Sequence, residues 1–339
     1  MRAIGRAILL ALLLLGAATM ARAEDIAGFY RGKQIRLVVG TAAGQDYDIW
    51  ARLIARHLGR HIAGNPGFVV ENMPGGGHII ATNYLFNIAA KDGSVLGMVT
   101  RNITDDAILN VPNVRFEPQK FTWLGSPEIN HRGLFVASRA GVEKAEDLFR
   151  QEVVLGATGA GQAVTTAPIL LKNVLGMKLK IVLGYGAPQD VVLAIERGEV
   201  AGLVDSVGAA NGARRQWIRS GLMRLLFTME QGKLGWAEVP TVFDLVKNDE
   251  QRQIFAFLAS SMELGRPLLA PPGVPAERAQ ALRRAFDATM RDPAFLKDAD
   301  SLGFEVTPQT GEEIERRTKE AMATPREIAD KAERAAAQN

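Results

Sequence analysis

One stretch decides the fold: Gly40-Thr41-Ala42-Ala43-Gly44-Gln45-Asp46-Tyr47-Asp48. It follows the apolar run at 35–39, which predicts a buried strand, and it precedes apolar residues at helical spacing over 49–58. A loop of small residues between a strand and a helix directs several free backbone N–H groups toward one point. Because a helix N-terminus also carries partial positive charge, this loop predicts an anion-binding site.

The same order of strand, loop and helix recurs along the chain. A strand at 67–73 precedes the loop Pro74-Gly75-Gly76-Gly77-His78 and a helix at 79–88. Two later units have strands at 152–156 and 179–183, loops at 157–162 and 184–188, and helices at 163–175 and 189–196. Further strands are expected at 94–99, 122–125, 134–137, 199–204 and 221–228. Further helices are expected at 275–290, at 293–302 and from 311 onward, with a frayed tail at 331–339.

Strands that alternate with helices predict an α/β fold with parallel, doubly wound sheets. In such sheets, ligands bind beyond the carboxyl ends of the strands, where all of these loops lie. Two sheets in one chain would place the loops on opposite walls of one cleft. We therefore expect two doubly wound lobes joined by crossover strands, with residues 24–126 and 255–339 in lobe 1 and residues 127–254 in lobe 2.

The first 23 residues predict a secretory signal peptide rather than part of the fold. Arg2 and Arg6 precede an apolar stretch at 7–18 that is too short to span a bilayer, and Ala21-Arg22-Ala23 is a cleavage pattern. A retained membrane anchor is the alternative interpretation. Such a signal peptide would direct export from the cytoplasm and be removed from the mature protein.

Charge and cysteine content exclude several classes of function. The chain has 40 Lys and Arg against 37 Asp and Glu, and the signal peptide holds three of the basic residues, so the mature protein balances 37 with 37. A net charge near zero gives no support for binding to nucleic acid or to a membrane surface. The absence of cysteine excludes disulfides, thiolate catalysis and cysteine-based metal sites.

Side chains that could perform chemistry are few. His57 and His61 lie four residues apart on a predicted helix and could hold a metal, but the arginines beside them favour a solvated face. No H-E-x-x-H, G-x-S-x-G or Walker phosphate-loop motif occurs. Ser206 with His78 is the best nucleophile and base pair that an exported enzyme could use. We expect no catalytic residue, no cofactor and no metal.

The carboxylates near the loops have structural interpretations. Asp46 and Asp48 are expected to cap the following helix by accepting hydrogen bonds from its first N–H groups, with Asp48 directed at backbone donors. Asp205 has two interpretations that the residues leave open. It could accept from a ligand hydroxyl or ammonium group, or it could cap a helix that begins at Ser206.

Several short motifs follow one another in an order found in one protein family. They are the strand and loop at 35–48, Asn72-Met73-Pro74-Gly75-Gly76-Gly77, Asp92-Gly93, and the segments 156–162, 184–186, 196–200, 239–241 and 270–275. From about residue 29 to about residue 318, the chain resembles the periplasmic substrate-binding proteins of tripartite tricarboxylate transporters, the Bug family. Each motif is weak alone, whereas the ordered series is specific.

The resemblance implies a type II periplasmic binding fold, the Venus flytrap, whose two lobes close on a ligand. It implies a periplasmic monomer that binds a small carboxylate and delivers it to the large and small membrane subunits of a permease. A ligand-binding sensor subunit of a two-component system and an exported enzyme are the alternatives. The residues expected to bind the ligand are Thr41, Ala42, Ala43, Gly44, Gln45, Asp46, Gly75, Gly76, Gly77, His78, Thr100, Gly159, Ala160, Gly161, Gln162, Tyr185, Gly186 and Asp205.

The chain departs from the family pattern in ways that bear on the ligand. Thr41-Ala42 stands where aromatic and proline residues are common, Gln45 replaces a glycine, and His78 replaces a small residue. Gln162 lies where a Ser or Thr commonly reaches the ligand. These changes leave the backbone donors in place and add side-chain donors, which predicts a polar or longer acid. His78 is either a direct ligand contact or a surface loop histidine.

Overall fold

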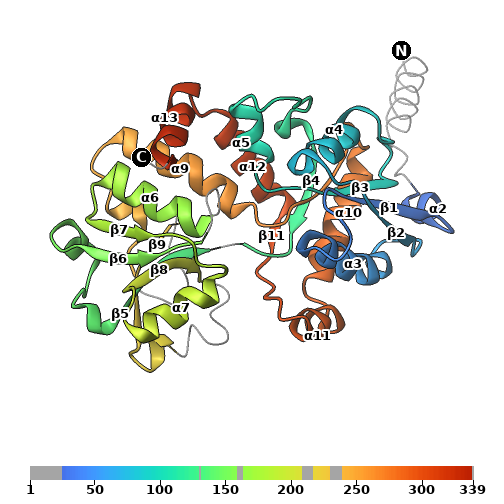
Figure 1. The fold of residues 1–339 in the computed structure, drawn as a ribbon. Coiled ribbons are helices and arrows are strands. Elements are labelled where there is room, and N and C mark those ends of the chain that lie inside the picture. The colour runs from blue at the N-terminus through green and yellow to red at the C-terminus, as the bar shows by residue number, and fades with distance from the viewer. Residues whose placement is uncertain (1–24, 130, 159–162, 208–216, 230–238, 338–339) are drawn as a thin grey trace, which may run out of the picture.

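The computed structural model describes residues 25–129, 131–158, 163–207, 217–229 and 239–337 of the 339-residue chain. Its strands form two separate sheets, which lie in two halves of an elongated molecule (Figure 1). The first sheet has six strands in the order β11-β4-β10-β3-β1-β2, and the second sheet has five in the order β7-β6-β8-β5-β9. The expected α/β fold with two sheets is confirmed.

Strands β1 to β9 lie within a few residues of the predicted ones, whereas β10 and β11 had no predicted counterpart. The first sheet contains β1 (Gln34–Val39), β2 (Gly67–Asn72), β3 (Val95–Met98), β4 (Thr122–Ser126), β10 (Leu268–Ala270) and β11 (Gln309–Thr310). The second sheet contains β5 (Arg132–Ala137), β6 (Val153–Gly156), β7 (Leu179–Val182), β8 (Gly202–Ser206) and β9 (Met223–Thr228).

The two sheets share one topology. In each sheet the strand next to one edge, β1 or β6, pairs in parallel with the next two strands along the chain. In each sheet the strand that arrives from the other sheet, β10 or β5, lies antiparallel between its two neighbours. Each sheet thus combines the expected parallel strands with antiparallel pairing at the crossover strand.

The register explains this reversal. Arg132, the first residue of β5, pairs with Ser206, the last residue of β8, and Leu268 at the start of β10 pairs with Met98 at the end of β3. Each crossing segment thus enters its new sheet at the edge where the parallel strands end, and it must run back from there. As a result, both crossings lie at the same edges as the predicted ligand loops.

Helices cover both faces of each sheet. They are α2 (Ile26–Tyr30), α3 (Asp46–Leu58), α4 (Ile79–Asn87), α5 (Ile103–Ile108), α6 (Ala163–Leu175), α7 (Pro188–Arg197), α9 (Asp249–Glu263), α10 (Ala276–Thr289), α11 (Pro293–Ser301), α12 (Gly311–Met322) and α13 (Arg326–Ala336). Short 3-10 turns lie at Gly59–His61, Gly76–His78, Pro118–Lys120, Ser138–Ala140, Ala145–Phe149 and Val242–Asp244. No helix in these described segments is both long and apolar enough to cross a membrane.

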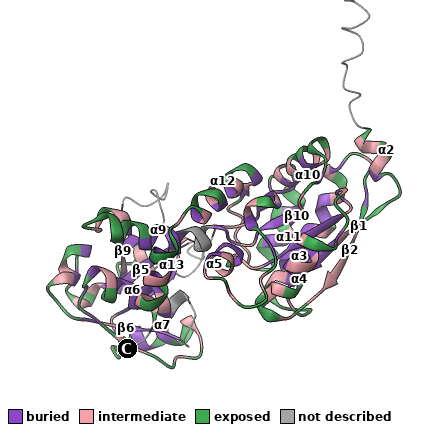
Figure 2. Cartoon of the chain, turned by 90° about the horizontal axis from the view of Figure 1, so that it is seen from above, coloured by how far each residue is buried: buried purple, intermediate pink, exposed green. Residues whose placement is uncertain are grey.

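The alternation of β1 divides the first core into two layers. Leu37 and Val39 pack with Trp50 of α3 and Phe286 of α10, whereas Val38 points to the opposite face. There it packs with α4 and α12, as the period of two in a strand requires. Buried residues, purple in Figure 2, accordingly follow the strands and the helix faces turned toward them in both halves.

The C-terminal helix α13 connects the two halves, and the expectation that the tail frays from 331 is wrong as far as Ala336. Ile328, Ala329 and Ala332 are buried against α9 and α5. Arg326 Nη1 donates to the Ile108 carbonyl at 2.9 Å, and further along the helix the Ala335 carbonyl accepts from an asparagine of α6 at 2.8 Å. The helices α2, α5 and α9 and the short strands β10 and β11 were not predicted from the sequence. The assignment of each helix to a lobe stays a prediction.

Candidate functional site

The predicted ligand loops of the first half lie at the edge of the first sheet where β1, β2 and β3 end. Residues 42–46 are exposed there, as are Gly76 and Gly77. The backbone N–H groups of Thr41, Ala42, Ala43 and Gly75 donate to no acceptor in the part of the chain that the structure describes. This edge therefore presents free donors from two adjacent loops, as an anion site requires.

Backbone conformation explains the glycine run of the second loop. Gly75, Gly76 and Gly77 have φ values of 132°, 56° and 61°, a region that side chains rarely adopt. A Cβ at Gly75 would also lie 2.5 Å from Ile80 Cδ1. The run is thus a conformational requirement of the loop, which keeps its backbone uncovered.

Asp48 joins the first loop to the second, and it does so without capping the helix. Its Oδ2 accepts from the Gly44 N–H at 2.8 Å and from Arg52 Nε at 2.9 Å, and its Oδ1 accepts from Asn72 Nδ2 at 2.9 Å. The same Asn72 amide donates to the Thr41 carbonyl at 2.9 Å. Burial raises the pKa of Asp48, but the hydrogen bonds from Arg52, Gly44 and Asn72 outweigh burial and lower it below its ordinary value.

Asp48 accepts from a backbone donor as expected, whereas the prediction that Asp46 and Asp48 cap the first turn of α3 is wrong. The N-cap is Gln45, whose side chain makes no capping hydrogen bond, and the Asp48 bond to Gly44 precedes the helix. Asp46 instead pairs with Arg266, whose Nε donates to Asp46 Oδ2 at 2.6 Å. The physical reason is that charged or preceding donors, Arg266 for Asp46 and Gly44 with Arg52 for Asp48, take the carboxylates in place of the first-turn N–H groups.

Arg266, beside the candidate site, was not predicted from the sequence. Besides Asp46, it binds the Glu128 carboxylate on the crossing segment between β4 and β5, and it lies over the ring of Tyr47 at 5.6 Å. Arg266 itself precedes β10 after the second crossing. It thus links both crossing segments to the first loop. No local sequence signal marks this contact, because 220 residues separate Arg266 from Asp46.

A hollow of about 120 Å³ lies between the two halves beside this cluster. Asp46, Trp50 and Arg266 of the first half line it together with Ser206 at the end of β8. Because a helix of the first half and a strand end of the second half both border the hollow, it lies where the two halves approach each other.

His78 lies against the first loop. Its ring contacts the Gly40 backbone closely, and it meets the Tyr47 ring edge-on, with centroids 4.8 Å apart. Nδ1 of His78 is buried without a hydrogen-bond partner in the described segments. Burial lowers the pKa of His78 to about 4, so the imidazole is neutral at physiological pH.

The second half contributes fewer described residues to the site. Tyr185 is half-buried beside Gly156, and Gly186 is exposed in the same loop. Asp205 is 5% exposed, and its Oδ1 accepts from the Ser206 N–H at 2.7 Å. On the first half, Thr100 is half-buried and accepts from the Asn102 N–H at 3.2 Å. The predicted contacts Gly159, Ala160, Gly161 and Gln162 lie outside the described residues.

The candidate pairs for metal binding and catalysis have other partners. His57 Nε2 lies 2.9 Å from Asp298 Oδ2, and His61 Nε2 lies 2.8 Å from Asp292 Oδ2. Over the segments that the structure covers, no group of three or more His, Asp or Glu side chains is arranged to hold a metal. Ser206 borders the hollow between the halves, whereas His78 packs on Gly40.

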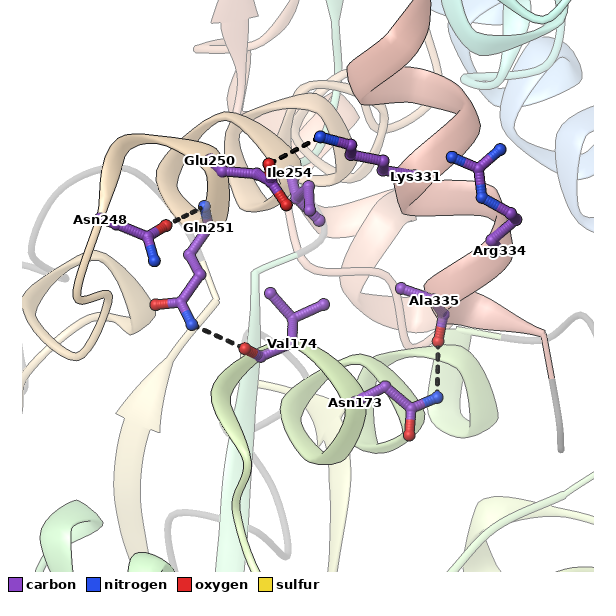
Figure 3. Close-up of a pocket in the computed structure, with 9 residues that line it drawn as sticks. All are labelled: Asn173, Val174, Asn248, Glu250, Gln251, Ile254, Lys331, Arg334 and Ala335. Atoms are coloured by element: carbon purple, nitrogen blue, oxygen red, sulfur yellow. Dashed lines mark hydrogen bonds and ion pairs between the residues drawn. The ribbon is translucent and has the colours of Figure 1, made fainter.

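A second hollow, of about 570 Å³, lies elsewhere, between α6, α9 and α13 (Figure 3). Its polar side chains mostly bind one another or the backbone. Lys331 pairs with Glu250 at 2.6 Å, and Gln251 Nε2 donates to the Val174 carbonyl at 2.7 Å. This groove is a junction between packed helices, distant in the fold from the strand-end loops.

Two matched α/β sheets, joined by crossing segments at their ligand edges, define the class: the fold is that of type II periplasmic binding proteins. The chain belongs to the tripartite tricarboxylate transporter family receptors, whose family model matches residues 50–333. It is therefore a solute-binding protein of that receptor family.

Individual relatives are distant in sequence. A UPF0065 protein of Bordetella bronchiseptica is 23% identical over 279 residues, which cover 80% of this chain and 78% of the relative. A TctC solute-binding protein from Polaromonas, solved without ligand, is 17% identical with a TM-score of 0.71, over 89% of this chain and 99% of the other.

Two similar structures contain an organic acid. MatC from Rhodopseudomonas palustris, with bound malate, is 17% identical with a TM-score of 0.52, over 88% of this chain and 99% of the other. Rpa4515 of R. palustris, with adipate, is 20% identical with a TM-score of 0.53, over 89% and 98%. At this distance the likeness establishes the fold alone.

Proposed function

We propose that the protein captures a small organic acid between its two halves in the periplasm, after loss of a signal peptide, and delivers it as a monomer to a tripartite tricarboxylate-type permease. One observation carries the proposal: Thr41, Ala42, Ala43 and Gly75 present free N–H groups at one exposed edge. Malate in MatC and adipate in Rpa4515 support a carboxylate as the ligand class.

The backbone donors can supply the affinity that such a receptor needs. A hydrogen bond to a charged group contributes about 1.5–3 kcal/mol net, and a micromolar dissociation constant corresponds to about 8 kcal/mol. Donors from two loops reach that range. Contacts with the second half, including Tyr185, Gly186 and Asp205, would then offset the cost of ordering both partners.

Closure follows from the two-half architecture. Lobe 1 would comprise 24–126 and 255–339, and lobe 2 would comprise 127–254, with bending at the crossings beside Glu128 and Arg266. A ligand that contacts both walls only in the closed form shifts the population toward that form. The permease subunits would recognise the closed form, and no chemical step is required.

A thermal-shift screen tests the proposal. The purified protein is heated with acetate, lactate, succinate, malate, citrate, adipate or benzoate, and at least one acid should raise the melting temperature. Gly76→Val should abolish that shift, because φ of 56° strains a β-branched residue and its side chain would cover the loop backbone. No shift with any acid, or a full shift in Gly76→Val, would contradict the proposal.

A further inference from the structure

His78 carries two local costs that a structural loop residue would avoid. Its φ of 79° lies in the left-handed region, where residues other than glycine are strained. Its Nδ1 is buried without a partner in the described part of the chain, although buried polar atoms are normally hydrogen-bonded. Costs of this kind persist mainly at functional sites, and both fall on the residue that ends the second ligand loop.

Gly40 holds the imidazole in one place. A Cβ on Gly40 would lie 2.3 Å from His78 Nδ1 and 2.6 Å from its Cγ, so the ring occupies the space that a side chain would take. Tyr47 contacts the ring edge-on at 69°. The His78 carbonyl accepts from Thr82 Oγ1 at 2.9 Å, which fixes the backbone. The ring is therefore positioned by three elements.

This position selects one tautomer. Nδ1 lies in the space beside Gly40 with no hydrogen-bond partner in the described residues, and a buried N–H without an acceptor is costlier than a buried lone pair. The proton therefore belongs on Nε2, which is not among the buried unpartnered atoms and has no hydrogen-bond partner in the described residues. His78 thus directs an N–H donor outward at the loop edge.

The surroundings keep this donor uncharged. Burial is the cause of the lowered pKa of His78, about 4. Tyr47 is the titratable group in contact with the ring, and the charged groups next to Tyr47 are Arg266, which lies over the Tyr47 ring, and its partner Asp46. Arg266 also pairs with Glu128, and burial, not these charged groups, is what lowers the pKa of His78.

We propose that His78 is a specificity-determining residue that donates a neutral Nε2–H hydrogen bond to an oxygen of the bound acid, and that Gly40 is its positioning residue. This inference rests on the proposed function. It assigns the ligand an acceptor oxygen at the second loop, and a neutral donor suits a hydroxyl or carbonyl oxygen as well as a carboxylate. Affinity should therefore vary less than threefold between pH 5.5 and pH 8.

Amide variants test the donor position. Gln places its amide nitrogen near the Nε2 position, whereas Asn places it near Nδ1. With the acid of the screening panel that gives the largest thermal shift, calorimetry should show at least tenfold weaker binding for His78→Asn and His78→Gly. His78→Gln should restore most of that loss. His61→Gln, in the 3-10 turn Gly59–His61 where the histidine pairs with Asp292, is the control and should bind like the wild type.

Gly40→Ala tests the positioning role. The added methyl would displace the ring, so this variant should also bind at least tenfold more weakly. Its effect should largely vanish when His78 is already Gly, because the two changes remove the same contact. His78→Gly should keep its melting temperature within about 2 °C, since glycine relieves the positive φ. A merely structural histidine would instead lower the melting temperature without changing affinity.

The free protein provides a readout that needs no ligand. In a 15N-histidine NMR spectrum, His78 should show the Nε2–H tautomer and no titration above pH 5. Charging of His78 near pH 6.5, or equal affinity for wild type, His78→Asn and Gly40→Ala, would overturn the inference while leaving the proposed function intact. If no acid of the panel binds at all, the proposed function fails, and the ligand contact assigned to His78 fails with it.

Discussion

Asp48→Ala should lower the free energy of unfolding by about 2–3 kcal/mol. It removes the hydrogen bonds that hold the first ligand loop, at 40–45, against the second, at 74–78. Asp48 is 1% exposed and accepts from Gly44, Asn72 and Arg52. The Arg52 side chain is 48% exposed, so its bond contributes less than about 1 kcal/mol. The Gly44 and Asn72 donors lose a buried, charged acceptor. Each loss costs about 1–1.5 kcal/mol net, after the cost of burying the carboxylate is subtracted.

Urea unfolding at pH 7, followed by circular dichroism, measures this loss. Arg52→Ala is the matched control, because it removes only the exposed partner and should cost less than about 1 kcal/mol. Asp48→Ala should also weaken acid binding, because the two loops that present the free N–H groups are then no longer held in fixed positions relative to each other. Equal losses of stability in the two variants would refute the reasoning that the buried carboxylate joins the loops.

Three further predictions concern the pKa of Asp48, the ion pairs of Arg266 and the buried face of α13. The pKa of Asp48 is lowered on folding, so its contribution to the free energy of unfolding is present above the unfolded pKa of 3.8 and is lost as pH falls through the folded pKa. The difference in stability between wild type and Asp48→Asn should therefore narrow between pH 6 and pH 2. A difference that stays constant over this range would contradict the prediction. Arg266→Ala should lower the free energy of unfolding by about 1–3 kcal/mol and weaken acid binding, because Glu128 and Asp46 both lose their ion-pair partner. Urea unfolding and ligand titrations measure the two effects. Unchanged stability and affinity would show that the Arg266 ion pairs contribute to neither. Ala332→Asp should lower the free energy of unfolding by about 2–4 kcal/mol, because it buries a charge between α13 and α9. Arg334→Asp on the same helix is the control and should lower it by less than about 1 kcal/mol. Similar urea midpoints for the two variants would contradict the burial of Ala332 against α9.

Much of the fold could be predicted because short-range patterns encode it. The strand β1 reads as a run of apolar residues, and Leu37 and Val38 prove to face opposite layers. The helix α6 has the bounds 163–175 that its sequence predicts. Periodicity of this kind reports burial directly, and the turn glycines mark where each element ends.

Direction and long-range pairing could not be predicted in the same way. Nothing local in β5 or β10 shows that they run antiparallel to their neighbours, because that depends on where the crossing segments enter each sheet. The helix α13 reads as an alanine-rich polar tail. It is ordered because Ala329 and Ala332 meet α9, a partner far away in the sequence.

In the candidate site, too, local features could be predicted from the sequence and long-range contacts could not. The exposed loop backbone at 41–46 and the glycine run follow from a strand–loop–helix pattern, so they could be predicted. The roles of Asp46 and Arg266 depend on contacts across 220 residues, so capping was predicted instead. The unpartnered Nδ1 of His78 is likewise invisible in sequence, since it arises from the approach of Gly40 to the second loop.

Amide chemical-shift mapping tests the account most directly. The 15N-labelled protein is titrated with the best acid of the screening panel, and each backbone amide is followed. Thr41, Ala42, Ala43 and Gly75 should show the largest downfield changes, as their free N–H groups gain an anionic acceptor. Shifts confined to the groove between α6, α9 and α13, with those four amides unmoved, would contradict capture by the loop backbone.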